Sequence, residues 1–125
     1  MNHESRLFEA GPDPLGRMWK VQFRWLQTGI SIRHADTVDV KFFVTPDGGP
    51  TEEKVIALPH PELLTITVQQ GGKLTDPFCM RLAAVHLRHM IETSEDMEKT
   101  LVTLSAQEIE HYARQLHSET VPQHA

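Results

Sequence analysis

The stretch from Asp76 to Glu92 constrains the fold of this chain most, because it predicts a helix with very little polar surface. Thr75 or Asp76 can cap this helix, since a short side-chain oxygen accepts hydrogen bonds from the free N–H groups of the first turn. Pro77 suits the first helical position. Apolar side chains fill one broad face at helical spacing, and a second apolar patch lies nearly opposite. A helix of this kind must be covered on most of its circumference, so we expect it at the centre of the domain.

An alternating pattern from Met18 to Leu26 predicts a strand with one buried face, because large apolar side chains take every second position. Aromatic rings dominate the energetics of a small core. The sequence therefore predicts five buried side chains on this strand and the central helix: Trp19, Phe23, Trp25, Leu82 and Leu87.

Further strands are expected between this first strand and the central helix. Thr28-Gly29 breaks the alternation, and Ile30 with Ile32 indicates a short second strand. Residues 37–45 and 53–58 alternate on either side of a Pro-Asp-Gly-Gly-Pro turn, which is typical of an antiparallel hairpin.

The segment His60 to Gln70 carries both helix and strand signals, and we favour a short helix because Gly71-Gly72 is a good stop. After the central helix, residues 99–104 predict a last strand. Ser105 and Glu108 form a capping box, in which the side chain of each residue accepts a hydrogen bond from the backbone N–H of the other. We expect the helix that follows to dock on the sheet through Ile109, Tyr112, Ala113 and Leu116.

These elements predict an α+β fold, with an antiparallel sheet of about four or five strands packed against a central hydrophobic helix and a C-terminal helix. We expect one domain over residues 17–118. Residues 1–16 and 119–125 show no period, and we expect them to be flexible tails.

Charge and composition limit the classes of binding partner that we expect. The net charge is −5 and no basic stripe follows any expected element, so we expect no nucleic-acid binding. No apolar run approaches the ~20 residues needed to span a membrane, and the N-terminus does not resemble a signal peptide. We therefore expect a cytoplasmic protein without membrane contact. An exposed sheet edge favours pairing, which predicts a homodimer.

The densest polar cluster is Arg33, His34 and Asp36, with Asp39 close behind, where the chain turns between strands. Arg81 and Arg88 form a polar stripe on the central helix. A guanidinium binds carboxylate or phosphate groups bidentately. These five residues (Arg33, His34, Asp36, Arg81 and Arg88) are the candidate binding site for a small anionic ligand, against the alternative of an Asx turn and structural ion pairs.

Metal binding is the competing chemical hypothesis. His86 and His89 stand one turn apart on the central helix, and His34 and Asp36 are the natural further ligands. Glu108 and His111 repeat the i, i+3 spacing on the last helix, but a carboxylate-bridged site needs matching ligands on four helices. Cys79 lies on the most apolar face of its helix, which favours inert packing over nucleophilic catalysis.

No catalytic motif stands out, and the sequence leaves open whether the protein is an enzyme and which cofactor, if any, it uses. We expect a small intracellular binding or regulatory domain that takes an anionic ligand or a protein partner. The alternative is a metal-dependent enzyme of hydrolase type that uses the His34, Asp36, His86 and His89 cluster.

Overall fold

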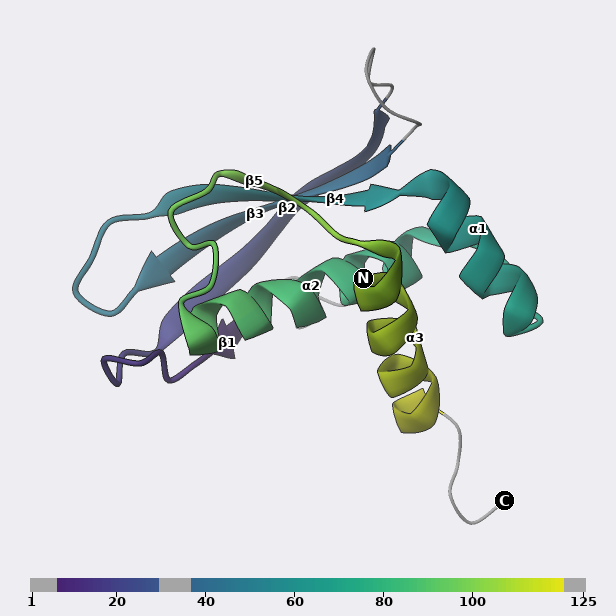
Figure 1. Ribbon diagram of the computed structural model, residues 1–125. Coiled ribbons are helices and arrows are strands. Elements are labelled where there is room, and N and C mark those ends of the chain that lie inside the picture. The colour runs from purple at the N-terminus through teal and green to yellow at the C-terminus, as the bar shows by residue number, and fades with distance from the viewer. Residues whose placement is uncertain (1–6, 30–36, 121–125) are drawn as a thin grey trace.

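A computed structural model describes residues 7–29 and 37–120 (Figure 1). The elements in chain order are β1 (Leu7–Ala10), β2 (Trp19–Gly29), β3 (Thr37–Pro46), β4 (Glu52–Pro59), α1 (His60–Gln69), α2 (Asp76–Thr93), β5 (Leu101–Thr103) and α3 (Ala106–Thr120). The predicted α+β class is confirmed.

The five strands form one sheet in the order β1-β2-β3-β4-β5. The first three pairings are antiparallel, and only β5 runs parallel to its neighbour β4. The predicted hairpin is present as β3 and β4. Burial alternates without a break along β3, where the even-numbered residues point into the core. One face of the sheet is therefore apolar and the other is largely solvated, as is common in antiparallel sheets.

Helix α2 lies along the inner face of the sheet and contacts β1 to β4, as its apolar circumference predicted (Figure 1). The Oγ1 atom of Thr75 accepts a hydrogen bond from the N–H of Phe78 at 3.3 Å and caps the helix. Leu82 and Leu87 are completely buried. The central position of this helix is confirmed.

Helix α1 forms where we favoured a helix, and the capping box of α3 is also confirmed. The Ser105 N–H donates to Glu108 Oε1 at 2.9 Å, and the Glu108 N–H donates to Ser105 Oγ at 3.1 Å. The expected docking of α3 was wrong. Because α2 already covers the inner face of the sheet, α3 packs its buried stripe mainly against α1 and α2.

The N-terminal segment contains a strand where the sequence predicted a flexible tail. Residues 7–10 form β1 and pair with residues 19–22 of β2. Four residues are too few to show a strand period, which explains the wrong assignment. The loop that follows is held by Asp13, whose carboxylate accepts from the backbone N–H groups of Leu15 and Arg17, from Arg17 Nε and from Trp19 Nε1. Burial alone would raise the pKa of Asp13, but these donors outweigh it and lower the pKa to about 2.

Strand β2 contains a β-bulge that the sequence did not reveal. Phe23 pairs with Phe42, whereas Trp25 pairs with the next residue of β3, Lys41, so that Arg24 is an extra residue. A bulge of this kind shifts the side-chain alternation by one position. Leu26 therefore takes the inward position and Trp25 points to the opposite face, where it is 37% exposed. The predicted burial of Trp25 was wrong, while Trp19 is buried and Phe23 packs against the core.

The expected break at Thr28-Gly29 was also wrong, since β2 continues to Gly29. The strand proposed at Ile30 and Ile32 lies outside the described residues. The last strand is present but short, and Lys54 helps to place it. Lys54 takes an inward position on β4, and its Nζ atom donates to the carbonyl groups of Met97 at 2.5 Å and Lys99 at 2.7 Å.

Candidate functional sites on the sheet and between the helices

The outer face of the sheet, opposite α2, is the first candidate site, and the bulge at Arg24 shapes it. Trp25 lies beside Lys41 of β3, which lies beside Val55 of β4, which pairs with Leu101 of β5. This row crosses four strands. Leu101 is 57% exposed, and the described helices all lie on the other side of the sheet. Two large apolar side chains thus meet solvent on one face, which is a feature of interaction surfaces.

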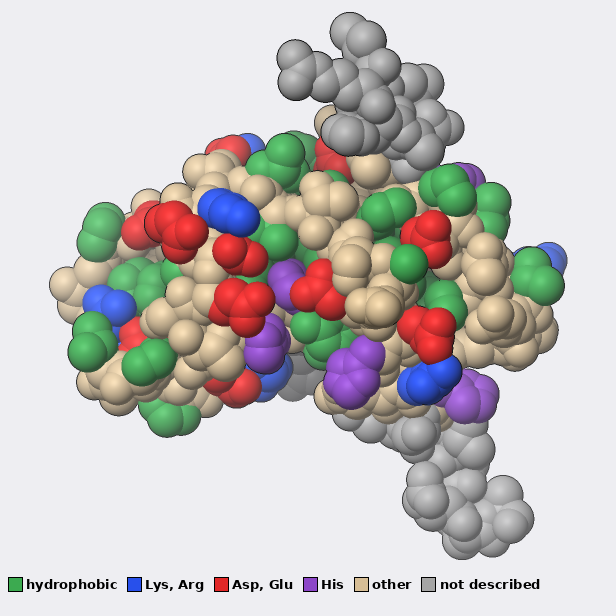
Figure 2. All heavy atoms as spheres, in the orientation of Figure 1, with side chains coloured by type: hydrophobic (Ala, Val, Ile, Leu, Met, Phe, Trp, Pro, Cys, Tyr) green, Lys and Arg blue, Asp and Glu red, His purple; other side chains and the backbone are tan. Residues whose placement is uncertain are grey.

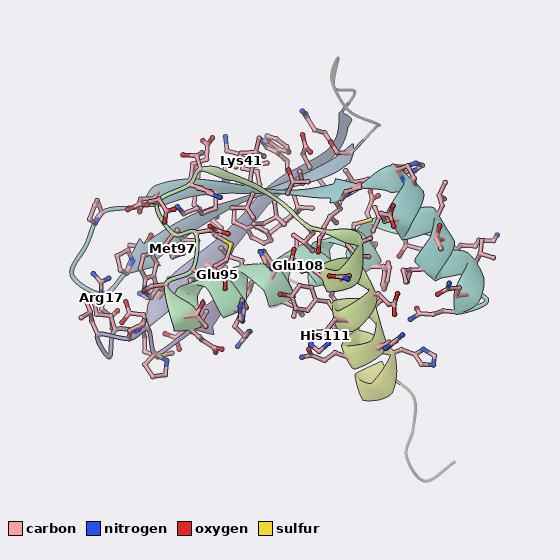
Figure 3. All side chains as sticks on the ribbon, in the orientation of Figure 1. Arg17, Lys41, Glu95, Met97, Glu108 and His111 are labelled. Carbon is pink, nitrogen blue, oxygen red and sulfur yellow. The ribbon has the colours of Figure 1, made fainter. Side chains whose placement is uncertain are left out.

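Cations cover the aromatic rings of this face. The Arg24 guanidinium lies 5.0 Å from the centre of the Phe43 ring, and Lys41 Nζ lies 5.5 Å from the Trp25 ring and 5.6 Å from the Phe43 ring. Lys41 also pairs with Glu53 at 2.8 Å. Figure 3 labels Lys41 on the sheet, well separated from Glu108 and His111 of the helical layer. Each cation–π contact at an exposed site contributes roughly 0.5–1 kcal/mol and leaves the charge accessible.

We refer to Arg24, Trp25, Lys41, Phe43 and Glu53 as the open-face cluster. Beyond this cluster, the strand register also turns Glu9, Lys20 and Asp39 outward. Among the described strand residues, the outer face therefore carries three cations and three carboxylates, although the whole chain has a net charge of −5. In Figure 2, acidic and histidine side chains gather instead over the face that shows α2 and α3. This outer face, which we call the open face, is therefore close to neutral, whereas the whole chain is acidic.

The second candidate site lies between α2 and α3, around a buried histidine. His86 is 2% exposed, and its Nδ1 atom shares a hydrogen bond of 2.8 Å with the hydroxyl of Tyr112. Glu108 Oε2 lies 3.9 Å from the same nitrogen. The other ring nitrogen, Nε2, is buried and has no hydrogen-bond partner among the described residues. The ring therefore uses one of its two nitrogens to join the helices.

Burial dominates the electrostatics of this pair. It lowers the pKa of His86 below its usual value of 6.5, and the nearby Glu108 only partly opposes this shift. Burial, together with Glu108, raises the pKa of Tyr112 to about 12. Both side chains are consequently neutral at pH 7. A neutral histidine beside a neutral tyrosine can position a hydrogen bond, but it carries no charge to offer an ionic ligand.

The two histidines of the metal hypothesis diverge in their surroundings. His86 is buried, whereas His89 is exposed and its Nε2 atom lies 3.2 Å from Glu95 Oε2. The ring centres of His86 and His89 are 6.2 Å apart. Within residues 7–29 and 37–120, no group of three or more His, Cys, Asp or Glu side chains could hold a metal ion. His34 and Asp36 lie outside the described residues, so the complete metal site stays a prediction.

Of the five residues predicted to bind an anion, Arg33, His34 and Asp36 lie outside the described residues, while Arg81 and Arg88 are exposed on α2. Arg88 lies 5.1 Å from the Phe8 ring.

Phe8 pairs with Val21 near the start of β2, whereas residues 30–36 follow the end of that strand. Eight residues of strand separate these points by roughly 26 Å. Arg88 therefore does not lie near the ends of β2 and β3 that flank Arg33, His34 and Asp36.

Cys79 is buried, as predicted, and burial raises the pKa of its thiol to about 11. The thiolate is therefore rare at neutral pH, which fits inert packing.

The open-face cluster was not predicted from the sequence. One signal was present: Phe43 occupies the polar side of β3, directly after the inward Phe42. The position of Trp25 had no such signal, because its exposure depends on the bulge.

No protein-family model matches the sequence, and no significant match to the chain was found among curated proteins or solved structures. None of the helices in the described part of the chain is both long enough and apolar enough to cross a membrane.

Proposed function

We propose that this protein is a non-catalytic interaction module that binds a protein partner through the open face of its sheet. The observation that carries the proposal is the bulge at Arg24, which turns Trp25 out of the core. A tryptophan can bury more apolar area than any other side chain. The partial exposure of Trp25 therefore leaves on the order of 2 kcal/mol of favourable burial free energy unrealised in the single chain. A partner that covers Trp25 would recover this contribution.

The chemistry of the cluster indicates what the partner presents. Trp25 and Leu101 offer apolar contact, and Arg24 has no ion pair among the described residues. A guanidinium stacked on an aromatic ring keeps its edge free for a carboxylate. The open face therefore favours a partner segment that combines carboxylates with apolar side chains. This retains the expected class of binding domain and moves its site from the predicted arginines to Arg24 and Lys41.

A titration followed by amide chemical shifts tests the proposal. The probe is a short synthetic peptide that alternates Glu and Leu, and the control peptide has Lys in place of Glu. We expect shifts at Trp25, Lys41 and Phe43 with the acidic peptide only, and loss of these shifts in Trp25→Ala. Shifts confined to α2 and α3, or equal responses to both peptides, would contradict the proposal.

A further inference from the structure

We infer that the partner which fits the open face is a second copy of this chain, packed sheet against sheet about a two-fold axis. This inference rests on the proposed function and names its partner. A symmetric interface uses the same patch on both copies, so the patch must complement itself. The outer face is compatible with this condition, because its described strand residues carry three cations and three carboxylates around the apolar side chains of Trp25, Val55 and Leu101.

The strand order gives the arrangement. Strand β2, with Arg24, lies on one side of β3, and β4, with Glu53, lies on the other side. A two-fold axis parallel to β3 and between the two sheets places β2 of one copy over β4 of the second. It also places β3 over β3, so Lys41 of each copy, which is paired with Glu53 of its own chain, faces Lys41 of the other copy.

The register supports the same contact along the strands. The Arg24 guanidinium lies over Phe43, and Phe43 pairs with Glu53. Arg24 therefore stands level with Glu53 of the second copy, and the symmetry repeats the contact. The carboxylate of Glu53 has enough lone pairs to accept from Arg24 of the second copy and, at the same time, from Lys41 of its own chain.

The size of the face sets the expected strength. Five strands spaced by about 4.8 Å, with a usable length of roughly 25 Å, give a face on the order of 600 Å² per copy. Two copies would bury roughly 1,200 Å², which is at the lower end for specific interfaces. The sheets would pack in the aligned manner of a β-sandwich. The row that runs from Trp25 to Leu101 in each copy would lie at the centre of the interface. We expect dissociation in the micromolar range.

Sedimentation equilibrium of the full chain across the micromolar range tests the inference. The wild-type mass should rise with concentration from that of one 14.2 kDa chain toward that of two. Arg24→Glu places two carboxylates against each other at both symmetric contacts, and we expect it to weaken association by about tenfold or more. Arg81→Glu is the matched control, because it changes the same charge on an exposed position of α2. It should change the dissociation constant by less than about threefold.

A charge-swap mixture makes the test specific. Glu53→Arg should also dissociate by repulsion, whereas Arg24→Glu mixed with Glu53→Arg restores opposite charges at both contacts. We expect the mixture to form a heterodimer when neither variant associates alone. A wild type that stays monomeric would overturn the inference, and the peptide titration would still decide the proposed function. A wild-type dimer that Arg24→Glu and Arg81→Glu weaken equally would also overturn it, since association would then use another surface.

Discussion

The open face of the sheet and the interface between α2 and α3 treat their most unusual side chains in opposite ways. On the sheet, an apolar side chain, Trp25, is turned outward and is 37% exposed. Between the helices, a polar side chain, His86, is buried and bonded to Tyr112. The first position leaves apolar surface for a partner, while the second side chain forms a hydrogen bond inside the chain through one of its two ring nitrogens. This difference is why we assign recognition to the sheet and a structural role to the histidine.

The causes of the two arrangements also differ. Trp25 is exposed because the backbone of β2 gains one residue relative to β3, so the strand register determines its direction. His86 is buried because α2 is apolar around most of its circumference and α3 packs over it. Substitutions should therefore affect stability strongly between the helices and weakly on the open face.

The two tryptophans give the largest expected contrast. Trp19 is 6% exposed and donates to Asp13, so Trp19→Ala should lower the free energy of unfolding by about 3–5 kcal/mol. Trp25→Ala should cost less than about 2 kcal/mol, because its ring is only partly buried and contacts Lys41. Urea melts of both variants give the comparison. Equal losses would mean that Trp25 belongs to the core and that the bulge does not expose it.

The helical layer should be similarly sensitive next to His86. Leu87 is completely buried, and Leu87→Ala should cost about 2–5 kcal/mol through lost burial and a new cavity. Val68→Ala is the control on α1, where the side chain is 77% exposed, and it should change stability by less than about 0.5 kcal/mol. An unchanged urea midpoint for Leu87→Ala would contradict the central position of α2.

The smallest expected effect is a dependence of stability on mild acid. The folded pKa of His86 is lowered below 6.5, so the unfolded chain binds a proton first as the pH falls. Stability should therefore be fully present above pH 6.5 and decline as the pH falls through and below this value. His86→Asn should flatten this decline, and His89→Asn, at an exposed position, should not. Thermal melts at a series of pH values measure both. A decline that survives in His86→Asn would assign the acid sensitivity to another group.

Asp13 also contributes to the acid sensitivity, but it does so at lower pH. Its folded pKa is about 2, below its usual 3.8, so the stability that it contributes is lost only as the pH falls from about 4 toward 2. The loss of stability due to Asp13 therefore begins at a lower pH than the loss due to His86.

Most of the fold could be predicted because its elements have long, consistent patterns. Helix α2 carries its cap, its proline and its apolar surface in one stretch, and β3 alternates over its full length. Strand β1 has four residues, which is shorter than a readable period. The docking of α3 depended on which element had already covered the sheet, and amphipathicity alone does not give this information.

The candidate site was less predictable for a physical reason. Alternation along β2 assigns Trp25 to the core, and a single extra residue at Arg24 reverses that assignment. Nothing in the residue types from Phe23 to Trp25 marks the bulge. The cation–π contact between Arg24 and Phe43 joins side chains of two different strands. The cluster can therefore be recognised only when the register of β2 and β3 is known.

Fluorescence quenching of Trp25 tests the central claim most directly. In Trp19→Phe, Trp25 is the only remaining tryptophan, because the chain has two. At low protein concentration, acrylamide should quench this residue readily, and its emission should be that of a partly exposed indole. As the concentration rises through the micromolar range, we expect quenching to fall and the emission to shift to shorter wavelength, because a second copy covers the ring. Adding Arg24→Glu should remove this dependence. Trp25 that is protected even in dilute solution, or equally exposed at every concentration, would contradict the account.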